Sequence, residues 1–354
     1  MSLQESLKNL FDSALSGGIF PGYSAAIVTS SGIVTFFGGN HTYDKMSLPV
    51  VESTLYDVAS LTKIVGPMSV MMHLVDTGMV GLDDKVSTYL SSFSHDTYKS
   101  EATIRNLLTY TLEYNLPNGA KSLMTKVMPD ELALRMIELP LKSMPGTSYM
   151  YSNITAFLLT QIIEKITKKN FYSLVQEEIF DTFSMSTSTF FPTEEQKLLI
   201  PPTEVTEDRG VVQGFVHDES THHLQSGDIS SGAAGLFTTA SDIAKFISRT
   251  LFFNNVEAQY FSKEMMQNFT TNQFASLLPT VTPLGWGDGN NELISLYPER
   301  FVVKGGFTGC FIIGDLKNKV GVVILSNSTY PIRPKDRKEF NKIKQKIIDL
   351  LSNK

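Results

Sequence analysis

The stretch "GCFIIGDLKNKVGVVILSNS", residues 309–328, decides the fold predicted for this chain of 354 residues. It contains two apolar runs rich in isoleucine and valine, which are separated by a turn at Lys317-Asn318. The preceding "RFVVKGG", residues 300–306, is a third run of this kind, so we expect three antiparallel strands. Near the other end of the chain, "YSAAIVTSSGIVTFFGG", residues 23–39, is typical of a β-hairpin that turns at Ser30-Ser31-Gly32.

Helical patterns dominate the chain between these β-rich ends. The stretch "NITAFLLTQIIEKI", residues 153–166, repeats apolar residues at helical spacing. A further helix is predicted for "TASDIAKFISRTLF", residues 239–252, with Ser241 or Asp242 as its N-cap. Apolar stripes also predict one helix near each end of the chain, at residues 7–15 and 340–350.

This order of elements predicts an α/β fold of the α+β type that is built from both ends of the chain. We expect residues 1–80 and 236–354 to form an antiparallel β-sheet flanked by N- and C-terminal helices. Residues 81–235 are expected to form an inserted, mostly helical domain. The active site is then predicted in the cleft between the two domains.

The composition argues against several classes of protein and partner. A net charge of −6 argues against binding to a nucleic-acid backbone. The single cysteine, Cys310, excludes an internal disulfide and a cysteine-rich metal cage. No apolar run reaches the ~18 residues that span a bilayer, and no signal peptide is predicted at the N-terminus. A location outside the cytoplasm stays open if a leader was removed, and the oligomeric state is left open as well.

The stretch "YDVASLTKIVG", residues 56–66, places a serine and a lysine three residues apart, Ser60 and Lys63. If Ser60 opens a helix, both side chains lie on one face and within reach of a hydrogen bond. The helix dipole at that end favours negative charge on the serine oxygen, and a base would activate the hydroxyl as a nucleophile. The alternative is a surface lysine beside a helix cap. The helix is expected to continue through Val75, with a kink at Pro67.

Partners for this pair are found in "PGTSYMYSN", residues 145–153, at the start of a helical run. Tyrosine is neutral at pH 7, but two nearby ammonium groups would favour the phenolate of Tyr151 and make it a base. Lys63 is one such group, and Lys304 is the candidate for the second. The amide of Asn153 can donate a hydrogen bond to a substrate carbonyl without adding charge.

Lys304 is followed by two glycines, Gly305 and Gly306, on a predicted strand. Glycines at these positions allow a ligand to lie against the strand as an added partner. The backbone N–H groups of Ser60 and Phe307 would then form an oxyanion hole for the carbonyl under attack.

Three motifs in this order, Ser60-x-x-Lys63, Tyr151-x-Asn153 and Lys304-x-Gly306, resemble the signature motifs of the serine β-lactamase and penicillin-binding protein superfamily. The tyrosine in the second motif is similar to that of class C β-lactamases, D-Ala-D-Ala carboxypeptidases and family VIII esterases. Further segments resemble the family in the family's order: "GGIFPGYSAAIV", "GLDDKV", "TIRNLLTYT", "AAGLFTTASDIAKF" and "GGFTGCFIIGDLKNKVGVVILSN". The resemblance therefore covers nearly the whole chain and implies the β-lactamase/DD-peptidase-like fold.

The resemblance also implies a covalent acyl-enzyme mechanism. Ser60 would attack a carbonyl, Lys63 and Tyr151 would share the acid and base work, and water would then release the acyl group. The amides of Ser60 and Phe307 would hold the oxyanion. Asn153 and the Lys304–Gly306 segment would bind and orient a small-molecule or peptide-like acyl substrate.

The chain departs from the family pattern at two places. Gly305 stands where the third motif usually carries a hydroxyl that helps to grip a substrate carboxylate, so efficient β-lactamase activity is not expected. The segment "LLTYTLE", residues 107–113, replaces the usual "LLTHTSG", which predicts a remodelled loop at the edge of the site. Tyr149 is a rival to Tyr151, but it lies four residues before Asn153 rather than two.

Two further residues have open roles. His217 in "GFVHDES" resembles a segment of relatives of penicillin-binding protein 4B, and it either lines the cleft or makes a structural hydrogen bond. Trp286 is either a cleft wall or a core anchor. The spacing of His217 and two later histidines fits no metal site, and no motif for a nucleotide or other cofactor is present, so we expect neither.

These observations predict a β-lactamase-like serine hydrolase that forms an acyl-enzyme on Ser60. An ester or amide substrate is expected, with an esterase or peptidase-like activity and poor turnover of β-lactams. The alternatives are a D-Ala-D-Ala carboxypeptidase, penicillin-binding protein or class C-like β-lactamase, and a catalytically idle relative used for binding or assembly. The natural substrate is left open, because specificity depends on loops.

Overall fold

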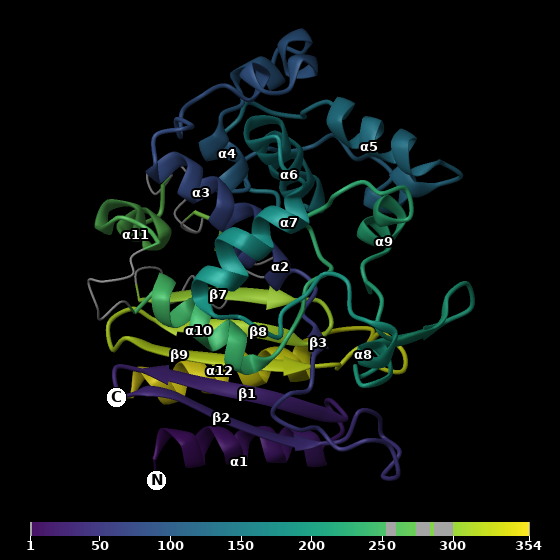
Figure 1. Ribbon diagram of the computed structural model, residues 1–354, viewed down its shortest axis with the longest axis vertical. Coiled ribbons are helices and arrows are strands. Elements are labelled where there is room, and N and C mark those ends of the chain that lie inside the picture. Colours follow the sequence, from purple (N-terminus) through teal and green to yellow (C-terminus); the bar gives the residue numbers. More distant parts are fainter. Residues whose placement is uncertain (1, 253–259, 274–283, 287–299, 354) are drawn as a thin grey trace.

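A computed structural model of the chain describes residues 2–252, 260–273, 284–286 and 300–353 (Figure 1). The described residues form a mixed α/β structure in which an antiparallel sheet lies next to a largely helical half. Within these ranges, no helix has both the length and the apolar character needed to cross a membrane.

The main sheet combines strands from both ends of the chain, in the spatial order β2-β1-β9-β8-β7. Every neighbouring pair is antiparallel. The hairpin at Ser30-Ser31 joins the first two strands, as predicted, and Thr29 faces Gly32 across it. The five strands are β1 (Gly22–Thr29), β2 (Gly32–Gly39), β7 (Phe301–Gly306), β8 (Cys310–Asp315) and β9 (Val320–Ser326).

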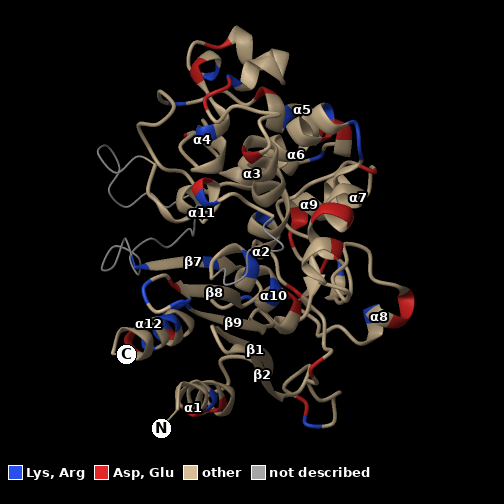
Figure 2. Cartoon of the chain, turned by 60° about the vertical axis from the view of Figure 1, so that its left-hand side comes forward, with Lys and Arg blue, Asp and Glu red and all other residues tan. Residues whose placement is uncertain are grey.

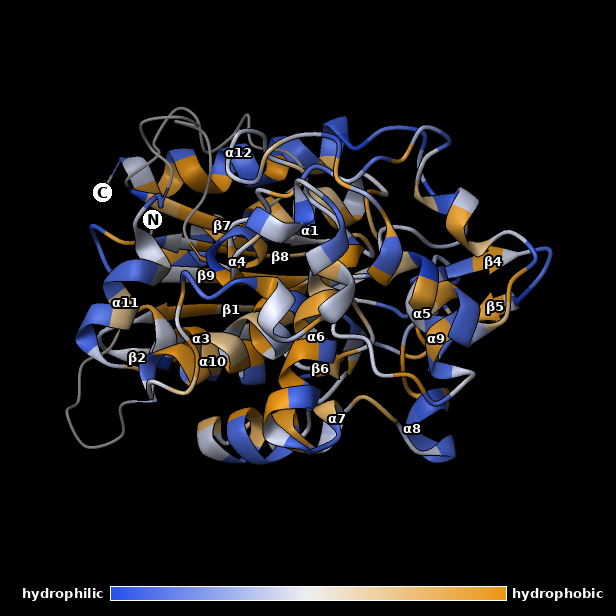
Figure 3. Ribbon diagram, turned by 90° about the horizontal axis from the view of Figure 1, so that it is seen from above, coloured by the Kyte–Doolittle hydropathy of each residue, from blue (hydrophilic) through white to orange (hydrophobic). Residues whose placement is uncertain are grey.

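Helices cover both faces of the sheet over β1, β9 and β8, which explains why these strands read as nearly continuous apolar runs, while the edge strand β2 is largely exposed. Phe311 and Ile313 of β8 face α1 (Leu3–Ser16) and α12 (Lys338–Ser352) on one side. Ile312 faces the other side, where α10 (Ala240–Thr250) packs on β1 and β9. Seen from above, the strands are coloured largely as hydrophobic (Figure 3).

The helical half lies above the sheet in Figure 1, beyond β7. Its longest helix, α6, begins directly after the Tyr151 motif and is almost fully buried along its length. The α-helices of this half are α4 (Ile104–Leu108), α5 (Pro129–Glu138), α6 (Asn153–Thr167), α7 (Phe171–Val175) and α9 (Glu219–Gln225). Shorter 3₁₀ and π segments are η2 (Val86–Thr88), η3 (Ser91–His95), η4 (Lys99–Glu101), η5 (Ala120–Met124) and η6 (Gln176–Asp181).

The remaining elements connect the two halves. The short strands β3 (Tyr56–Asp57) and β6 (Phe237–Thr238) pair with each other, so the chain segment before Ser60 is tied to the segment before α10. The stretch 200–236 contains α9 and a small hairpin, which is formed by β4 (Glu204–Thr206) and β5 (Gly210–Val212). The other connecting elements are α8 (Glu194–Leu198) and α11 (Lys263–Thr270).

The helix predicted from Ser60 to Val75 is present, with an interruption at the predicted place. It consists of α2 (Leu61–Lys63), a π-helical turn η1 (Ile64–Met68) and α3 (Ser69–Asp76). Pro67 lies inside the π-helical turn, where its missing N–H breaks the α-helical ladder. The hydroxyl of Ser69 donates to the carbonyl of Ile64 and so satisfies one of the freed backbone acceptors.

The predicted fold class is confirmed, including the sheet flanked by N- and C-terminal helices. The predicted cap of α10 is wrong. Thr239, not Ser241 or Asp242, is the N-cap, and its hydroxyl accepts from the N–H of Asp242 at 3.2 Å. The carboxylate of Asp242 is buried and accepts from Thr187 and Ser188 instead, a contact that helical periodicity does not predict.

Candidate active site

Ser60 stands at the junction of strand β3 and helix α2, at the N-cap position of the helix. The residue before it, Ala59, has a positive φ of 46°, an uncommon conformation for a residue with a side chain. The carboxylate of Asp57 accepts from the N–H of Ala59 at 2.8 Å and from the N–H of His217 at 2.8 Å. Asp57 therefore stabilises the sharp turn that presents Ser60.

Lys63 is fully buried beside Ser60. Its Nζ lies 2.9 Å from Ser60 Oγ, 2.7 Å from Asn153 Oδ1 and 2.7 Å from the carbonyl oxygen of Ala233. Three oxygen acceptors match the three N–H groups of an ammonium, so this arrangement suits the protonated lysine. Burial lowers the pKa of Lys63 to about 8, although the negative charge of Asp218 opposes the shift.

Tyr151 lies between two ammonium groups, as the sequence predicted. The Nζ of Lys63 is 5.3 Å from the centre of its ring, and the Nζ of Lys304 is 4.9 Å from the same centre. The basic residues of α2 and β7 lie inside the molecule, where the sheet meets the helices (Figure 2). Two positive charges this near to the ring favour the phenolate, which is the form that acts as a base.

Lys304 is also fully buried, and it contacts the loop that the sequence predicted to be remodelled. Its Nζ donates to the hydroxyl of Tyr110 at 2.8 Å and to the carbonyl of Gly285 at 3.3 Å. The ring centres of Tyr110 and Tyr151 are 5.0 Å apart. Glu113 of the same loop accepts hydrogen bonds from Ser148, in the segment that leads to Tyr151. The unusual "LLTYTLE" segment therefore supports the catalytic tyrosine candidate.

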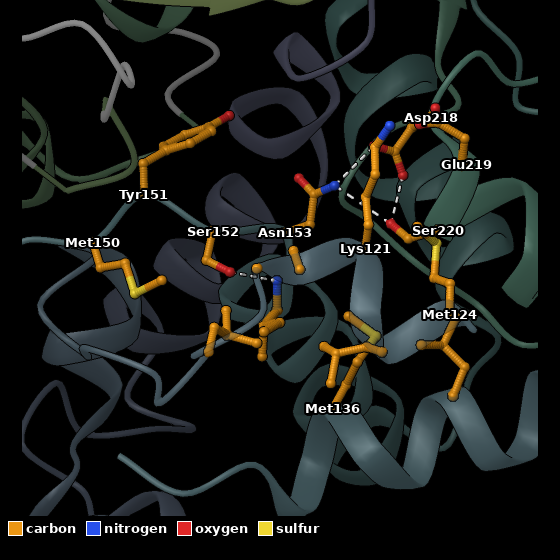
Figure 4. Close-up of a pocket in the computed structure, with 16 residues that line it drawn as sticks. Lys121, Met124, Met136, Met150, Tyr151, Ser152, Asn153, Asp218, Glu219 and Ser220 are labelled. Atoms are coloured by element: carbon orange, nitrogen blue, oxygen red, sulfur yellow. Dashed lines mark hydrogen bonds between the residues drawn. The ribbon is translucent and has the colours of Figure 1, made fainter. Parts of the chain in front are cut away.

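Asn153 is held by hydrogen bonds on both sides of its amide, and Figure 4 shows those made by its Nδ2. Its Oδ1 accepts from Lys63, and its Nδ2 donates to Asp218 Oδ2 at 2.8 Å and to Ser220 Oγ at 3.4 Å. An ammonium only donates and a carboxylate only accepts, so the orientation of the amide is fixed. The sequence predicted that Asn153 binds substrate. In the structure the amide hydrogens point at protein groups, which favours a positioning role.

The end of strand β7 packs directly against the segment that precedes Ser60. A Cβ atom at Gly306 would lie 2.3 Å from the carbonyl oxygen of Val58, which is closer than real Cβ atoms approach. The hydroxyl of Thr308 donates to the carbonyl of Asp57 at 2.7 Å. These contacts tie the two neighbours of Phe307 to the segment that precedes Ser60, which is compatible with the predicted oxyanion hole.

Strand β7 is the last strand of the described sheet and pairs only with β8 among the described strands. Its outer edge is therefore suited to the added-strand mode of ligand binding that Gly305 and Gly306 suggested.

Changing Gly306 to alanine is expected to lower both activity and stability. The added methyl group would push β7 away from Val58 and shift the adjacent Phe307, whose N–H is the predicted second donor of the oxyanion hole. We expect an activity loss of ~10²-fold, the size seen when one oxyanion donor is removed, and a loss of ~1–3 kcal/mol in unfolding free energy. Ester hydrolysis and urea unfolding measure the two effects.

The matched control for this change is Gly17→Ala, at the end of α1. Gly17 has a φ of −79°, and a Cβ there would be no closer than 3.3 Å to its nearest neighbour. A Gly306→Ala protein with wild-type activity would contradict the proposed position of the Phe307 amide.

A pocket of about 430 Å³ opens beside Tyr151 and Asn153 on the side of the helical half (Figure 4). Its walls come from η5, α5, the start of α6 and the start of α9. Most of the lining surface is apolar, and polar side chains stand at Lys121, Tyr151–Asn153 and Asp218–Ser220. The apolar lining residues are Leu116, Leu123, Met124, Leu132, Met136, Met150 and Ile154.

His217 is buried and is not among the residues that line this pocket. Its Nδ1 lies 2.9 Å from Thr203 Oγ1, and its backbone N–H donates to Asp57. Burial lowers the pKa of His217 to about 4, with a further contribution from the charge of Arg333, so the ring is neutral at pH 7. These contacts favour the structural interpretation over a cleft residue.

Trp286 is fully buried in the core, which resolves the choice between a cleft wall and a core anchor in favour of the anchor. In the described ranges, no group of three or more metal-binding side chains is close enough to hold an ion.

Sequence reasoning found the residues of the three motifs but missed three residues that hold them. Asp57, Tyr110 and Asp218 contact the motif residues directly or through one backbone group. Asp57 and Asp218 carried a detectable signal, because Asp218 follows His217 directly and Asp57 lies three residues before Ser60. Tyr110 was noticed only as a departure from the family pattern.

Ser60, the buried Lys63 and Tyr151 thus come together where the antiparallel sheet adjoins the helical half. A model of the Beta-lactamase family matches residues 7–345, and the chain therefore belongs to that family. This result agrees with the resemblance of the three motifs.

Individual proteins of this kind are similar over most of the chain. A protein of Escherichia coli O157:H7 named "Putative D-alanyl-D-alanine carboxypeptidase" is 28% identical, over 88% of this chain and 79% of its own length. The D-alanine carboxypeptidase AmpC from Burkholderia cenocepacia has a TM-score of 0.72 at 18% identity and covers 98% of each chain. EstCE1, a hydrolase with promiscuous acyltransferase activity, has a TM-score of 0.74 at 17% identity, over 99% of this chain and 98% of its own. Both solved structures share the fold.

Proposed function

We propose that the protein is a serine hydrolase that forms an acyl-enzyme on Ser60 and hydrolyses esters with an apolar acyl group. The observation that carries the proposal is the position of Ser60 Oγ. It lies within hydrogen-bonding distance of Lys63, whose ammonium group also contacts the Tyr151 ring. Such a cluster provides a nucleophile, a base and a cation that stabilises the base.

In the proposed mechanism, Ser60 Oγ attacks the acyl carbonyl carbon while its proton passes to the phenolate of Tyr151. Lys63 donates to Ser60 Oγ in the resting arrangement, so an ammonium there is not available to take that proton. The oxyanion is held by the N–H groups of Ser60 and Phe307. When the intermediate collapses, Tyr151 returns the proton to the departing alcohol.

Deacylation reverses these roles with water in place of the alcohol. Tyr151 takes a proton from the water as it attacks the acyl carbon, and the proton is then returned to Ser60 Oγ as the acid leaves. Lys304 and Lys63 stay protonated and stabilise the phenolate in each cycle.

The substrate class follows from two features of the site. Gly305 supplies no hydroxyl to bind a carboxylate beside the reacting carbonyl, and a neutral ester does not need one. The pocket next to Asn153 is lined mainly by leucine and methionine side chains, which favours an apolar chain. We assign this pocket to the acyl part of the ester.

The acyl-chain assignment predicts how activity depends on chain length. Each buried methylene contributes about 0.8 kcal/mol, so kcat/KM is expected to rise about fourfold per added methylene from acetyl to hexanoyl esters. Filling the pocket by Met124→Trp should shift the preference towards acetyl esters. Met46→Trp is the matched control, because Met46 is 90% exposed and does not line the pocket. A series of p-nitrophenyl esters measures both effects.

Esters whose alcohol rather than acyl chain is lengthened separate the two sides of the substrate. If Met124→Trp changes the alcohol preference and leaves the acyl preference intact, the pocket binds the leaving group and the assignment is wrong.

A second candidate function is a D-Ala-D-Ala carboxypeptidase or penicillin-binding protein. The similarity to the Escherichia coli protein over most of both chains favours it. Penicillin would then add its mass to Ser60 in a slowly hydrolysed adduct, and D-alanyl peptides would be cleaved. Mass spectrometry of the intact protein after incubation with penicillin distinguishes this function from the esterase. The contacts among Ser60, Lys63 and Tyr151 argue against the third alternative, a catalytically idle relative used for binding or assembly.

A further inference from the structure

Asp218 contacts the proposed catalytic machinery from outside the three motifs. Its Oδ2 accepts from Asn153 Nδ2 at 2.8 Å, and its Oδ1 accepts from Ser220 Oγ at 2.6 Å and from the N–H of Thr221 at 2.8 Å. Both carboxylate oxygens are therefore used. The same residue is the N-cap of α9, which fixes it to the wall of the pocket (Figure 4).

The carboxylate is connected to the nucleophile through two side chains, Asn153 and Lys63. Asp218 binds one end of the Asn153 amide, and the other end accepts from Lys63, which in turn contacts Ser60. If the carboxylate were absent, the amide of Asn153 would lose the partner that prevents it from turning its NH₂ group towards the ammonium. Asp218 thus determines which end of the amide faces Lys63.

The negative charge of Asp218 supports the same role as its hydrogen bonds. Although partial burial opposes ionisation, the hydrogen bond from Ser220 and the charge of Lys63 hold the pKa of Asp218 below its usual value. The site therefore contains a negative charge next to the buried ammonium at neutral pH.

We propose that Asp218 is a positioning residue that acts through Asn153 to keep Lys63 protonated and directed at Ser60, so that Tyr151 serves as the base. This inference rests on the proposed function for its kinetic part only. It assigns to Asn153 the task of connecting two charged groups, in place of the predicted contact with substrate.

The groups that face Lys63 determine in which direction the loss of Asp218 would change the pKa of Lys63. They are the neutral oxygens of Ser60, Asn153 and Ala233, the ring of Tyr151, the cation of Lys304 near the same ring, and the anion of Asp218. Besides the phenolate that Tyr151 forms in the proposed mechanism, Asp218 is the anion among these groups, so its removal leaves the ammonium with one negative charge fewer to offset Lys304. Lys63 then loses its proton at a lower pH.

The test is Asp218→Asn, which removes the charge and keeps an oxygen that accepts from Asn153. Asparagine is as good an N-cap as aspartate, so α9 should remain folded. The alkaline limb of the kcat/KM profile for a p-nitrophenyl ester should have its midpoint near pH 8 in the wild type. In the variant we expect this midpoint about one pH unit lower.

A second measurement does not need turnover. The folded-state pKa of Lys63, about 8, lies below its ordinary value of 10.5. The unfolded chain therefore binds more protons between these values, and stability rises with pH across that window. Urea unfolding from pH 6.5 to 10.5 should show this rise beginning about one pH unit lower in Asp218→Asn than in the wild type.

The matched control is Asp228→Asn, because Asp228 is exposed and has a positive φ of 58° that asparagine tolerates. Its profile should match the wild type. An unchanged unfolding profile for Asp218→Asn, or an equal shift in the control, would overturn the proposal. If the wild type does not hydrolyse any ester, the proposed function fails, while the unfolding profiles still decide the role of Asp218.

Discussion

Replacing Ser60 by alanine is expected to reduce kcat/KM for a short-chain p-nitrophenyl ester by ~10⁴-fold or more, because the acyl-enzyme can no longer form. Folding should be little affected, since Ser60 makes no side-chain cap bond to the helix that follows it. Hydrolysis measured side by side with the wild type, together with melting curves for both proteins, checks the expectation. The mass of the intact protein after treatment with a fluorophosphonate should increase for the wild type and stay constant for the variant.

Ser91→Ala is the matched control, because Ser91 is an exposed serine of η3 and the chemical change is the same. Equal turnover by Ser60→Ala and the wild type would show that another group attacks the ester. A folded wild type that neither hydrolyses esters nor reacts with the fluorophosphonate would leave a narrower substrate or no chemistry as the alternatives.

Replacing Lys63 by methionine is expected to reduce kcat/KM by ~10³-fold, the scale of a lost electrostatic stabiliser in an active site. Methionine keeps most of the side-chain volume but removes the ammonium that contacts Ser60 Oγ and stabilises the Tyr151 phenolate. The loss should appear mainly in kcat, because Lys63 is buried and contacts the nucleophile rather than the pocket. Steady-state kinetics on the ester that the wild type hydrolyses best measure it.

The chain offers a close control for this change. Lys99 is another buried lysine, whose Nζ donates to the carbonyl of Ile137 at 2.8 Å and lies 4.4 Å from the centre of the Phe93 ring. Lys99→Met removes a buried ammonium from the helical half, so it should affect stability and leave kcat unchanged. Similar losses of kcat in both variants would indicate a general effect of removing a buried charge, and the catalytic role of Lys63 would be rejected.

The two cations beside Tyr151 distinguish this site from an isolated serine–lysine pair. Lys63 is supported by Asn153 and the carbonyl of Ala233, and Lys304 is supported by Tyr110. Each ammonium therefore has hydrogen-bond acceptors in addition to its contact with the tyrosine ring. The positive charges are thus fixed in place before a substrate binds, as electrostatic stabilisation of a reacting group requires.

The sequence by itself determined the class of fold and the three motifs. Apolar runs at both ends specify strands that are buried on two faces, and a nucleophilic cluster needs a small set of residue types at short spacing, which leaves a recognisable pattern in Ser60-x-x-Lys63 and Tyr151-x-Asn153. The helix after Ser60 and its interruption at Pro67 were also predictable, because proline acts through its own missing N–H.

Only the tertiary structure decided how these motifs are supported. Asn153 and Asp218 are 65 positions apart, Tyr110 and Lys304 are 194 apart, and Asp57 and Thr308 are 251 apart. Each contact joins residues on different loops or elements. The spacing of residues along the chain does not predict which loops come together in the fold. The partner of a buried polar group is set by the packing around it, so the roles of Asp218 and Asp57 became visible only when the chain was folded.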